Sequence, residues 1–287
     1  MNDQNKGIAY AVLAAISLGF ITTFARLAYD AGFSPLTLIV LRALISAALV
    51  FLLVLVLRTP VYVPKDIRLN LLSCGIGITM ISFGYLSAVA FIPVGLAAII
   101  YYTFPIMVIG IEALQERKAP PVQQMIVFLF AFVGLVFVIG PGLDVLDWRG
   151  IACSLIGAVG TVIVFVSGRK LGAKLAPKVT VAYTNILVAC VGLLAVVVVD
   201  NFQLPHTSIG WWALGGVVLT YVIGIVAHMF AVKHAKASIA ALVFNMEPLV
   251  SIMLGWIILN ETLSLIQMAG VAIVIFAISC GARIASD

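Results

Sequence analysis

Long apolar stretches dominate the chain, and short polar segments separate them at regular intervals. Each stretch has the length of about 20 residues that a helix needs to cross a hydrocarbon core of ~30 Å. The stretches lack the period-two alternation of a membrane barrel, and hydrocarbon requires backbone groups that are satisfied within the segment. The pattern therefore predicts an all-α membrane protein with ten transmembrane helices, at residues 7–28, 35–57, 69–90, 94–114, 123–141, 150–168, 179–199, 211–232, 238–259 and 265–283.

The two halves of the chain match each other at a constant shift of 143 residues, without a gap across the first 100 positions compared. The recurring landmarks are Gly7-Ile8-Ala9 with Gly150-Ile151-Ala152, Arg26 with Arg169, Thr37 with Thr180, Ala97-Ala98 with Ala240-Ala241, and Pro105 with Pro248. Five helices in each half place the second copy upside down relative to the first, which is an arrangement found in secondary transporters. We therefore predict two inverted five-helix repeats, residues 1–143 and 144–287.

Composition and charge support an integral membrane protein. The chain is 64% hydrophobic and 9% charged, with a mean hydropathy of +1.25, whereas a soluble domain has about 25% charged residues. Of 16 lysines and arginines, 13 fall on the side that holds the N-terminus. The positive-inside rule then places both termini in the cytoplasm. We expect a multi-pass protein of the cytoplasmic (inner) membrane in contact with lipid and without a nucleic-acid partner, which would need a clustered basic face.

Few polar side chains occur at membrane depth, where a charge costs at least ~2.5 kcal/mol. Arg42 lies about two turns into the second span, and its repeat partner is Asn185. Glu247 lies near the middle of the ninth span, close to Asn245. Because intramembrane ionisable groups mark substrate or ion paths, we predict that these four residues bind substrate. The alternative is a structural role, in which Arg42 braces carbonyls or reaches outward and Glu247 holds two helices together.

Pro105 and Pro248 fall near the middle of the fourth and ninth spans. Proline clashes with the carbonyl four residues earlier, so both helices are predicted to kink and to free the carbonyls of Tyr101 and Phe244. Free carbonyls are acceptable only where they face protein or a water-filled cavity. We therefore predict that Tyr101, Tyr102 and Phe244 line a central site, with simple packing kinks as the alternative.

Other polar residues give weaker signals. His228 is predicted to bond a backbone carbonyl near the end of the eighth span, with a proton relay as the alternative. Glu112 and Glu116 are predicted to be solvated or paired with Arg117 and Lys118.

The chain lacks the residue patterns of an enzyme. The three histidines, at positions 206, 228 and 234, form no H-E-x-x-H motif, and no glycine-rich segment has the setting of a phosphate loop. We expect no catalytic residues, no metal and no bound cofactor, and leave coupling to a proton gradient open. Glu247 is the candidate for proton coupling, since desolvation disfavours a charged carboxylate.

Several segments match a known pattern of membrane carriers. These are Ser34-Pro35-Leu36-Thr37 followed by Arg42, Pro93-Val94-Gly95-Leu96-Ala97-Ala98 followed by Pro105, Ala237-Ser238-Ile239-Ala240-Ala241 followed by Glu247-Pro248, and Leu259-Asn260-Glu261-Thr262-Leu263-Ser264. With them the chain resembles the EamA-type ten-helix transporters of the drug/metabolite transporter superfamily over essentially its whole length. Glu116 lies two residues closer to its proline than Glu261 does, so Glu261 is the better match to the terminal glutamate of the family.

The resemblance implies a carrier for small metabolites, often an exporter of amino acids or related compounds, that works by alternating access. An importer or exchanger of the same fold is the main alternative, and an intramembrane enzyme or scaffold is a distant one. In such a carrier we expect the first four helices of each half to form the walls of a cavity. The fifth and tenth helices would then pack at the periphery or at a dimer contact, in a monomer or a homodimer.

Overall fold

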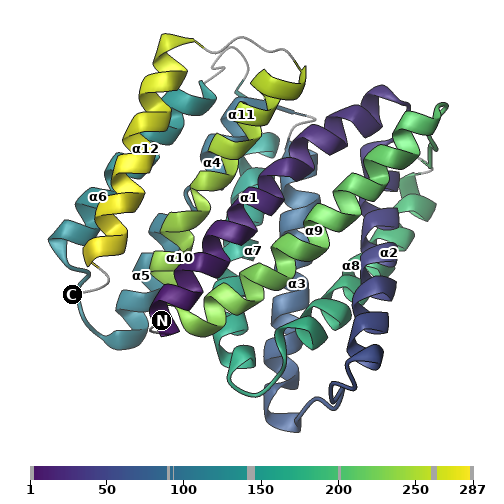
Figure 1. Cartoon of the computed structure of the whole chain (residues 1–287), viewed down its shortest axis with the longest axis horizontal. Coiled ribbons are helices and arrows are strands. Elements are labelled where there is room, and N and C mark those ends of the chain that lie inside the picture. The colour runs from purple at the N-terminus through teal and green to yellow at the C-terminus, as the bar shows by residue number, and fades with distance from the viewer. Residues whose placement is uncertain are drawn as a thin grey trace.

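The computed structural model describes residues 3–88, 91–92, 94–140, 146–199, 202–259 and 264–284. It is helical throughout, and the described residues contain no strand, which confirms the predicted fold class (Figure 1). The elements are α1 (Asp3–Asp30), α2 (Pro35–Val56), η1 (Lys65–Ile67), α3 (Arg68–Ala88), α4 (Val94–Tyr101), α5 (Phe104–Glu116), α6 (Val122–Ile139), α7 (Trp148–Gly172), α8 (Pro177–Val199), α9 (Ser208–His234), α10 (Ala237–Phe244), α11 (Met246–Leu259) and α12 (Leu265–Ile284).

Nine spans in the described part of the chain are long and apolar enough to cross a membrane, and a shorter apolar helix, Leu265–Gly281, occupies the tenth predicted position. Two of the nine spans are discontinuous. The fourth consists of α4 and α5, and the ninth consists of α10 and α11. The regular helix is interrupted at both kinks predicted there, although Thr103 and Asn245 keep right-handed helical backbone angles.

Proline explains where each break lies. α4 ends at Tyr101 and α5 begins at Phe104, so that Pro105 falls in the first turn of the new helix. Likewise α11 begins at Met246 and carries Pro248 in its first turn. Proline is tolerated in a first turn because its missing N–H would have no intrahelical partner there. Each proline therefore marks the start of a second helix within one span.

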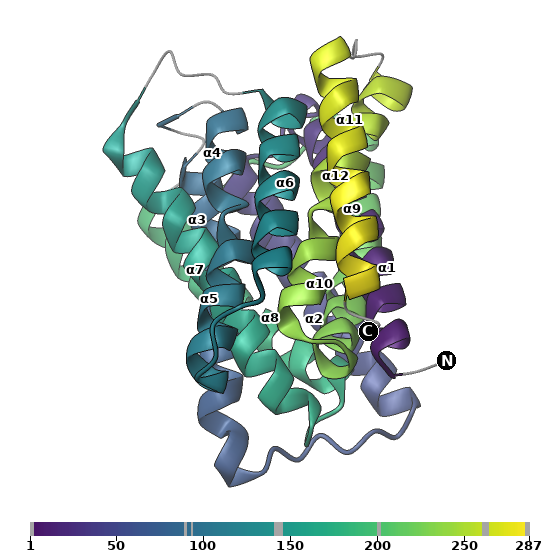
Figure 2. The ribbon, with the colours of Figure 1, turned by 90° about the vertical axis from the view of Figure 1, so that its left-hand side faces the viewer.

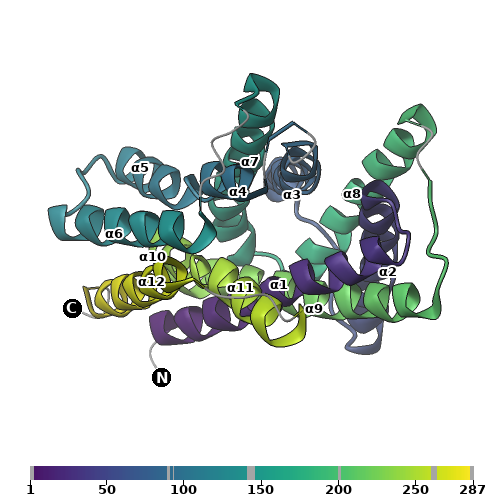
Figure 3. The same ribbon diagram turned by 90° about the horizontal axis from the view of Figure 1, so that it is seen from above.

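The helices form two layers, which are seen end-on in Figure 3. One layer holds α3, α4, α5 and α7, and the other holds α1, α9, α10 and α11. The pair α6 and α12 closes one end of the two layers, and the pair α2 and α8 closes the other. Each layer contains helices from both halves of the chain, so the halves are intertwined.

Contacts repeat between the halves with the helix directions reversed. A Cβ added at Gly7 would lie 2.5 Å from the Cβ of Ala235, and one added at Gly150 would lie 2.7 Å from Cγ1 of Ile92. Gly150 and Ala235 stand 143 positions after Gly7 and Ile92. α1 thus begins where α9 ends, and α7 begins at the opposite face, near the end of α3. This confirms the inverted two-repeat architecture; the predicted boundary between residues 143 and 144 lies outside the described residues.

We call the face where α1 begins and α12 ends the N-terminal face; it is at the bottom of Figure 1. The fifth and tenth predicted helices, α6 and α12, pack side by side at the periphery (Figure 2). The outer side of α6 exposes large apolar side chains, namely Met125, Ile126, Leu129, Phe130, Val133 and Phe137. Such a surface suits lipid or a second copy of the chain.

Candidate functional site

The position at which α2 begins determines how deep Arg42 lies. Ser34 caps this helix by accepting a hydrogen bond from the Thr37 amide at 3.2 Å, as is usual for serine at a helix N-terminus. Arg42 follows about two turns later. Its Nη2 donates to Oγ of Ser82 on α3 at 3.2 Å, and its Cζ lies 4.1 Å from the ring centre of Tyr221 on α9. Three helices therefore fix this guanidinium.

Three buried polar atoms near Arg42 have no hydrogen-bond partner among the described residues: Nε of Arg42 itself, Oγ of Ser46 and Oδ1 of Asn185. Asn185 is fully buried on α8, and both its side chain and the charge of Arg42 act on the Tyr221 hydroxyl. A buried polar atom without a partner costs ~1–3 kcal/mol. Donors and acceptors gathered in this way favour a site for a polar ligand over a purely structural role.

Glu247 forms a second cluster in the first turn of α11, where the helix dipole favours a carboxylate. Its side chain interacts with the Tyr102 hydroxyl and lies within electrostatic range of Tyr85 and Tyr101. The hydroxyl of Tyr101 accepts a hydrogen bond from Thr161 on α7 at 3.0 Å. The carboxylate therefore interacts directly with Tyr102 and feels two more tyrosines of the other layer.

Tyr29 and Tyr85 link the two clusters. Tyr29 lies within electrostatic range of Arg42, and Tyr85 lies within range of both Tyr29 and Glu247. We therefore treat the basic and the acidic cluster as one candidate site, with the cation nearer to the face opposite the N-terminal face.

An aromatic layer lies between this site and the N-terminal face. The ring centre of Phe165 is 4.9 Å from that of His228 and 5.8 Å from that of Phe244, and Phe104 packs on Phe165 at 6.0 Å. Since Phe244 is the last residue of α10, the layer lies about 10 Å above that face. His228 is deeper than predicted, because it is buried between two rings, and its Nε2 has no partner in the described part of the chain.

Exposure differs on the two sides of Glu247. The residues toward the opposite face are partly exposed: Tyr29, Arg42, Ser82, Tyr85 and Tyr101. The residues toward the N-terminal face are fully buried: Phe165, Ala231, Val232, Ala240 and Ala241. These polar side chains are thus more exposed than the residues that pack between Glu247 and the N-terminal face.

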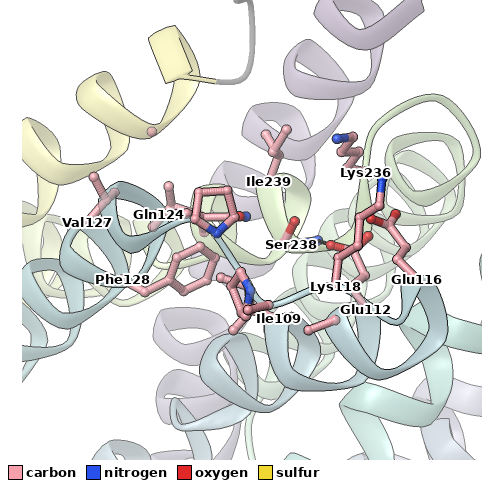
Figure 4. Close-up of a pocket in the computed structure, with 16 residues that line it drawn as sticks. Ile109, Glu112, Glu116, Lys118, Gln124, Val127, Phe128, Lys236, Ser238 and Ile239 are labelled. Atoms are coloured by element: carbon pink, nitrogen blue, oxygen red, sulfur yellow. Dashed lines mark hydrogen bonds between the residues drawn. The ribbon is translucent and has the colours of Figure 1, made fainter.

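The cavity drawn in Figure 4 is a different place. It has a volume of about 250 Å³ and lies at the N-terminal face, between α5, α6, α10 and α12. Ile109, Val127, Phe128 and Ile239 give it apolar walls, and Glu112, Glu116, Lys118 and Lys236 give it charged ones. It shares no lining residue with the site around Arg42 and Glu247.

The structure brings most of the predicted site residues together. Tyr101 and Tyr102 meet Glu247, and Arg42 approaches Asn185 through Tyr221. Asn245 is buried beside Glu247 with an unpartnered Oδ1, whereas the Phe244 ring belongs to the aromatic layer. The sequence did not single out Tyr29, Ser82, Tyr85, Phe165 and Tyr221, and it placed His228 in a minor role. A signal existed for Tyr85 and His228, because they occupy equivalent positions of the two repeats.

The prediction for Glu112 is wrong. Its carboxylate accepts hydrogen bonds from the amides of Ala237 at 2.9 Å and Ser238 at 3.2 Å, and it pairs with Arg169 at 3.2 Å. It therefore caps α10 from another helix, a contact that its sequence neighbours could not reveal. Glu116 is exposed, as predicted, and Glu261 lies outside the described residues.

Known proteins match the chain along its length. The model of the EamA-like transporter family matches twice, at residues 5–140 and 148–280. An "uncharacterized transporter" of Archaeoglobus fulgidus is 24% identical over 94% of this chain and 93% of its own length. The threonine/homoserine exporter RhtA of Escherichia coli (strain K12) is 26% identical over 74% of this chain and 70% of its own. A crystal structure with a TM-score of 0.85 and 16% identity covers 98% of this chain and 99% of that one, which shows the shared fold.

Proposed function

The chain belongs to the EamA-like transporter family, and from this premise we propose that it exports small metabolites, amino acids or related compounds, across the cytoplasmic (inner) membrane. The observation that carries the substrate class is the charge of the site: Arg42, with its unpartnered Nε, at one end and Glu247 at the other. A carboxylate suits the guanidinium fork, and an ammonium group suits a carboxylate. The name of the relative RhtA supports both an amino-acid substrate and export.

Alternating access follows from the inverted repeats. The two repeats, residues 1–143 and 144–287, would exchange conformations about their pseudo-two-fold axis and would open the N-terminal face as they close the opposite one. With the N-terminal face in the cytoplasm, as the basic loops predict, the tight packing between Glu247 and that face supports a state that opens to the outside. In that state an exporter releases its substrate.

Glu247 offers a way to couple export to a proton gradient. A carboxylate that lies beside tyrosine hydroxyls binds either a proton or the ammonium group of a substrate, but not both at once. Protons entering from outside would displace the substrate, and loss of the proton inside would prepare the site for the next molecule. Exchange at one shared site is a minimal form of antiport.

Uptake or exchange is the second candidate. The observation that favours it is the same difference in exposure, because a site that opens to the outside is also ready to accept an external substrate. Direction depends on the gradients and on which state rests at lower free energy, so it has to be measured.

The test is untargeted metabolite profiling of the medium and the cytoplasm of cells that produce the protein. The comparison is with the double variant Arg42→Ala, Glu247→Gln, and the control is Arg26→Gln, which removes an exposed arginine that pairs with Asp30 of its own helix. A compound enriched outside with both the wild type and the control, but not with the double variant, supports export. Enrichment inside supports uptake, and equal profiles for all three proteins contradict a transport role for the site.

A further inference from the structure

At the N-terminal face, a side chain of the first half of the chain caps a helix of the second half. Glu112 lies on α5. It accepts hydrogen bonds from the two amides at the start of α10, which belongs to the other layer. Arg169, on α7, holds the same carboxylate, whose side chain is only 14% exposed. α10 depends on this contact, because Lys236 at its own N-cap position makes no side-chain capping bond. The first amides of a helix need such a partner.

Among the described residues, the opposite face has no equivalent contact. The repeat counterpart of Glu112 is Gly255 at the shift of 143 residues, or Ile257 at the shift of 145 that holds after the prolines, and neither has a carboxylate. The counterpart of Arg169 is Arg26, which pairs at 3.7 Å with Asp30 of its own helix. Within the part of the chain that the structure describes, opening the opposite face therefore breaks no bond of this kind, whereas opening the N-terminal face separates α5 from α10.

We propose that Glu112 is a latch that keeps the N-terminal face closed and makes the state open to the opposite face the resting state of the empty carrier. Loss of the latch removes two charge-assisted hydrogen bonds and one ion pair from the closed face only. The population then shifts toward the state that is open at the N-terminal face, because that state loses nothing. The latch is a positioning device outside the substrate site, and its meaning for transport rests on the alternating access proposed above.

The experiment measures distances between spin labels on the empty protein in lipid nanodiscs, with the four native cysteines replaced by alanine. One label pair, at Gln115 and Lys233, spans the two layers at the N-terminal face, and a second pair, at Trp148 and Ser208, spans them at the opposite face; all four positions are exposed. Glu112→Gln is compared with Glu116→Gln, a matched control one turn further along α5 that is exposed. In the state open at the N-terminal face, the Gln115–Lys233 distance is longer and the Trp148–Ser208 distance is shorter. We expect the population of this state to rise several-fold in Glu112→Gln and to stay unchanged in Glu116→Gln.

A second variant separates the latch from the helix cap. Serine at position 236 would cap α10 from its own N-terminus. Lys236→Ser combined with Glu112→Gln therefore restores the cap but leaves the link between α5 and α10 weakened, because glutamine lacks the charge and one of the two acceptor oxygens. We expect this double variant to regain the thermal stability of the wild type and to keep the shifted distances. Wild-type distances in the double variant would show that Glu112 only caps a helix and would overturn the latch.

Two further outcomes decide the remaining cases. If Glu112→Gln does not fold, Arg169→Gln removes only the half-exposed ion-pair partner, and we expect a smaller shift in the same direction. Equal distances in the wild type, Glu112→Gln and Arg169→Gln would overturn the proposal. The distances need no substrate, so a failure of the transport proposal in metabolite profiling is seen separately from a failure of the latch.

Discussion

The two halves of the molecule place different side chains on the same backbone frame. At the break of the fourth span the first half has Tyr101, Tyr102 and Phe104, and the second half has Phe244, Asn245 and Glu247 at the equivalent positions. Arg42 and Asn185 differ in the same way, as do Tyr85 and His228. The fold is therefore nearly two-fold symmetric while the chemistry is not.

This difference separates two requirements of a carrier. Alternating access needs two backbone halves that can exchange conformations, which explains why the prolines and the close helix contacts recur. Recognition of one small polar molecule needs an asymmetric set of charges, and the proposed site accordingly takes one charged group from each half, at a different depth.

Removing the cation should have the largest effect. Arg42→Ala leaves the ligand group without its partner, and truncating one member of a buried charge pair costs ~2–5 kcal/mol, so we expect transport to fall on the order of 100-fold. The measurement is the transport rate of the metabolite found by profiling, in proteoliposomes. Arg26→Gln should transport at the wild-type rate, and an active Arg42→Ala would place the substrate elsewhere.

Neutralising the carboxylate of the other half should have a smaller and different effect. Glu247→Gln keeps the size of the side chain but loses a charge-assisted hydrogen bond of ~1.5–3 kcal/mol, so we expect about 10-fold slower transport. The rate should also lose its dependence on pH, because glutamine does not titrate. Transport measured from acidic to mildly alkaline pH tests this, and a variant that keeps the wild-type pH profile would exclude Glu247 as the coupling group.

The symmetric frame can be tested at one helix crossing. A Cβ at Gly160 on α7 would lie 2.6 Å from the Gly77 carbonyl oxygen of α3, which cannot move away easily. We expect Gly160→Ala to destabilise the protein by ~1–3 kcal/mol through overpacking. Thermal unfolding in detergent measures this.

The repeat counterpart of Gly160 is Ser17, which already has a Cβ, so Ser17→Ala is the matched control and should change the melting temperature little. If Gly160→Ala changes the melting temperature as little as Ser17→Ala does, the α3–α7 crossing has room for a Cβ and the prediction is wrong.

The smallest effect is expected at an exposed contact between the halves, Asp66 with Lys174. The hydrogen bond from Lys174 lowers the pKa of Asp66. Its contribution is therefore present at neutral pH and is lost as the pH falls through the lowered pKa. Solvent and salt screen such a pair, so Asp66→Asn should leave transport and the melting temperature at neutral pH unchanged. A clear loss of transport would show that this pair also helps to close the N-terminal face.

Sequence reasoning recovered the frame and the charged groups but not their surroundings. The prolines at 105 and 248 indicated where the fourth and ninth spans are interrupted, and the shift of 143 residues gave the repeat. The partners of Arg42 were not predictable, because Ser82 and Tyr221 are distant in sequence and look like ordinary polar residues within apolar spans. Glu112 was misjudged for the same reason: its neighbours in sequence are basic, whereas its actual partners belong to α7 and α10.

Hydropathy, helix-breaking residues and the repeat are local or periodic properties, so the amino-acid sequence by itself determined the membrane class, the spans, the two-repeat fold and the charges held at membrane depth. Only the tertiary structure decided which of these groups meet, which face is more tightly packed and which helix end Glu112 caps. Those outcomes depend on the packing of helices that lie far apart in the chain, where side-chain shape and close backbone approach, rather than hydrophobicity, select the neighbours.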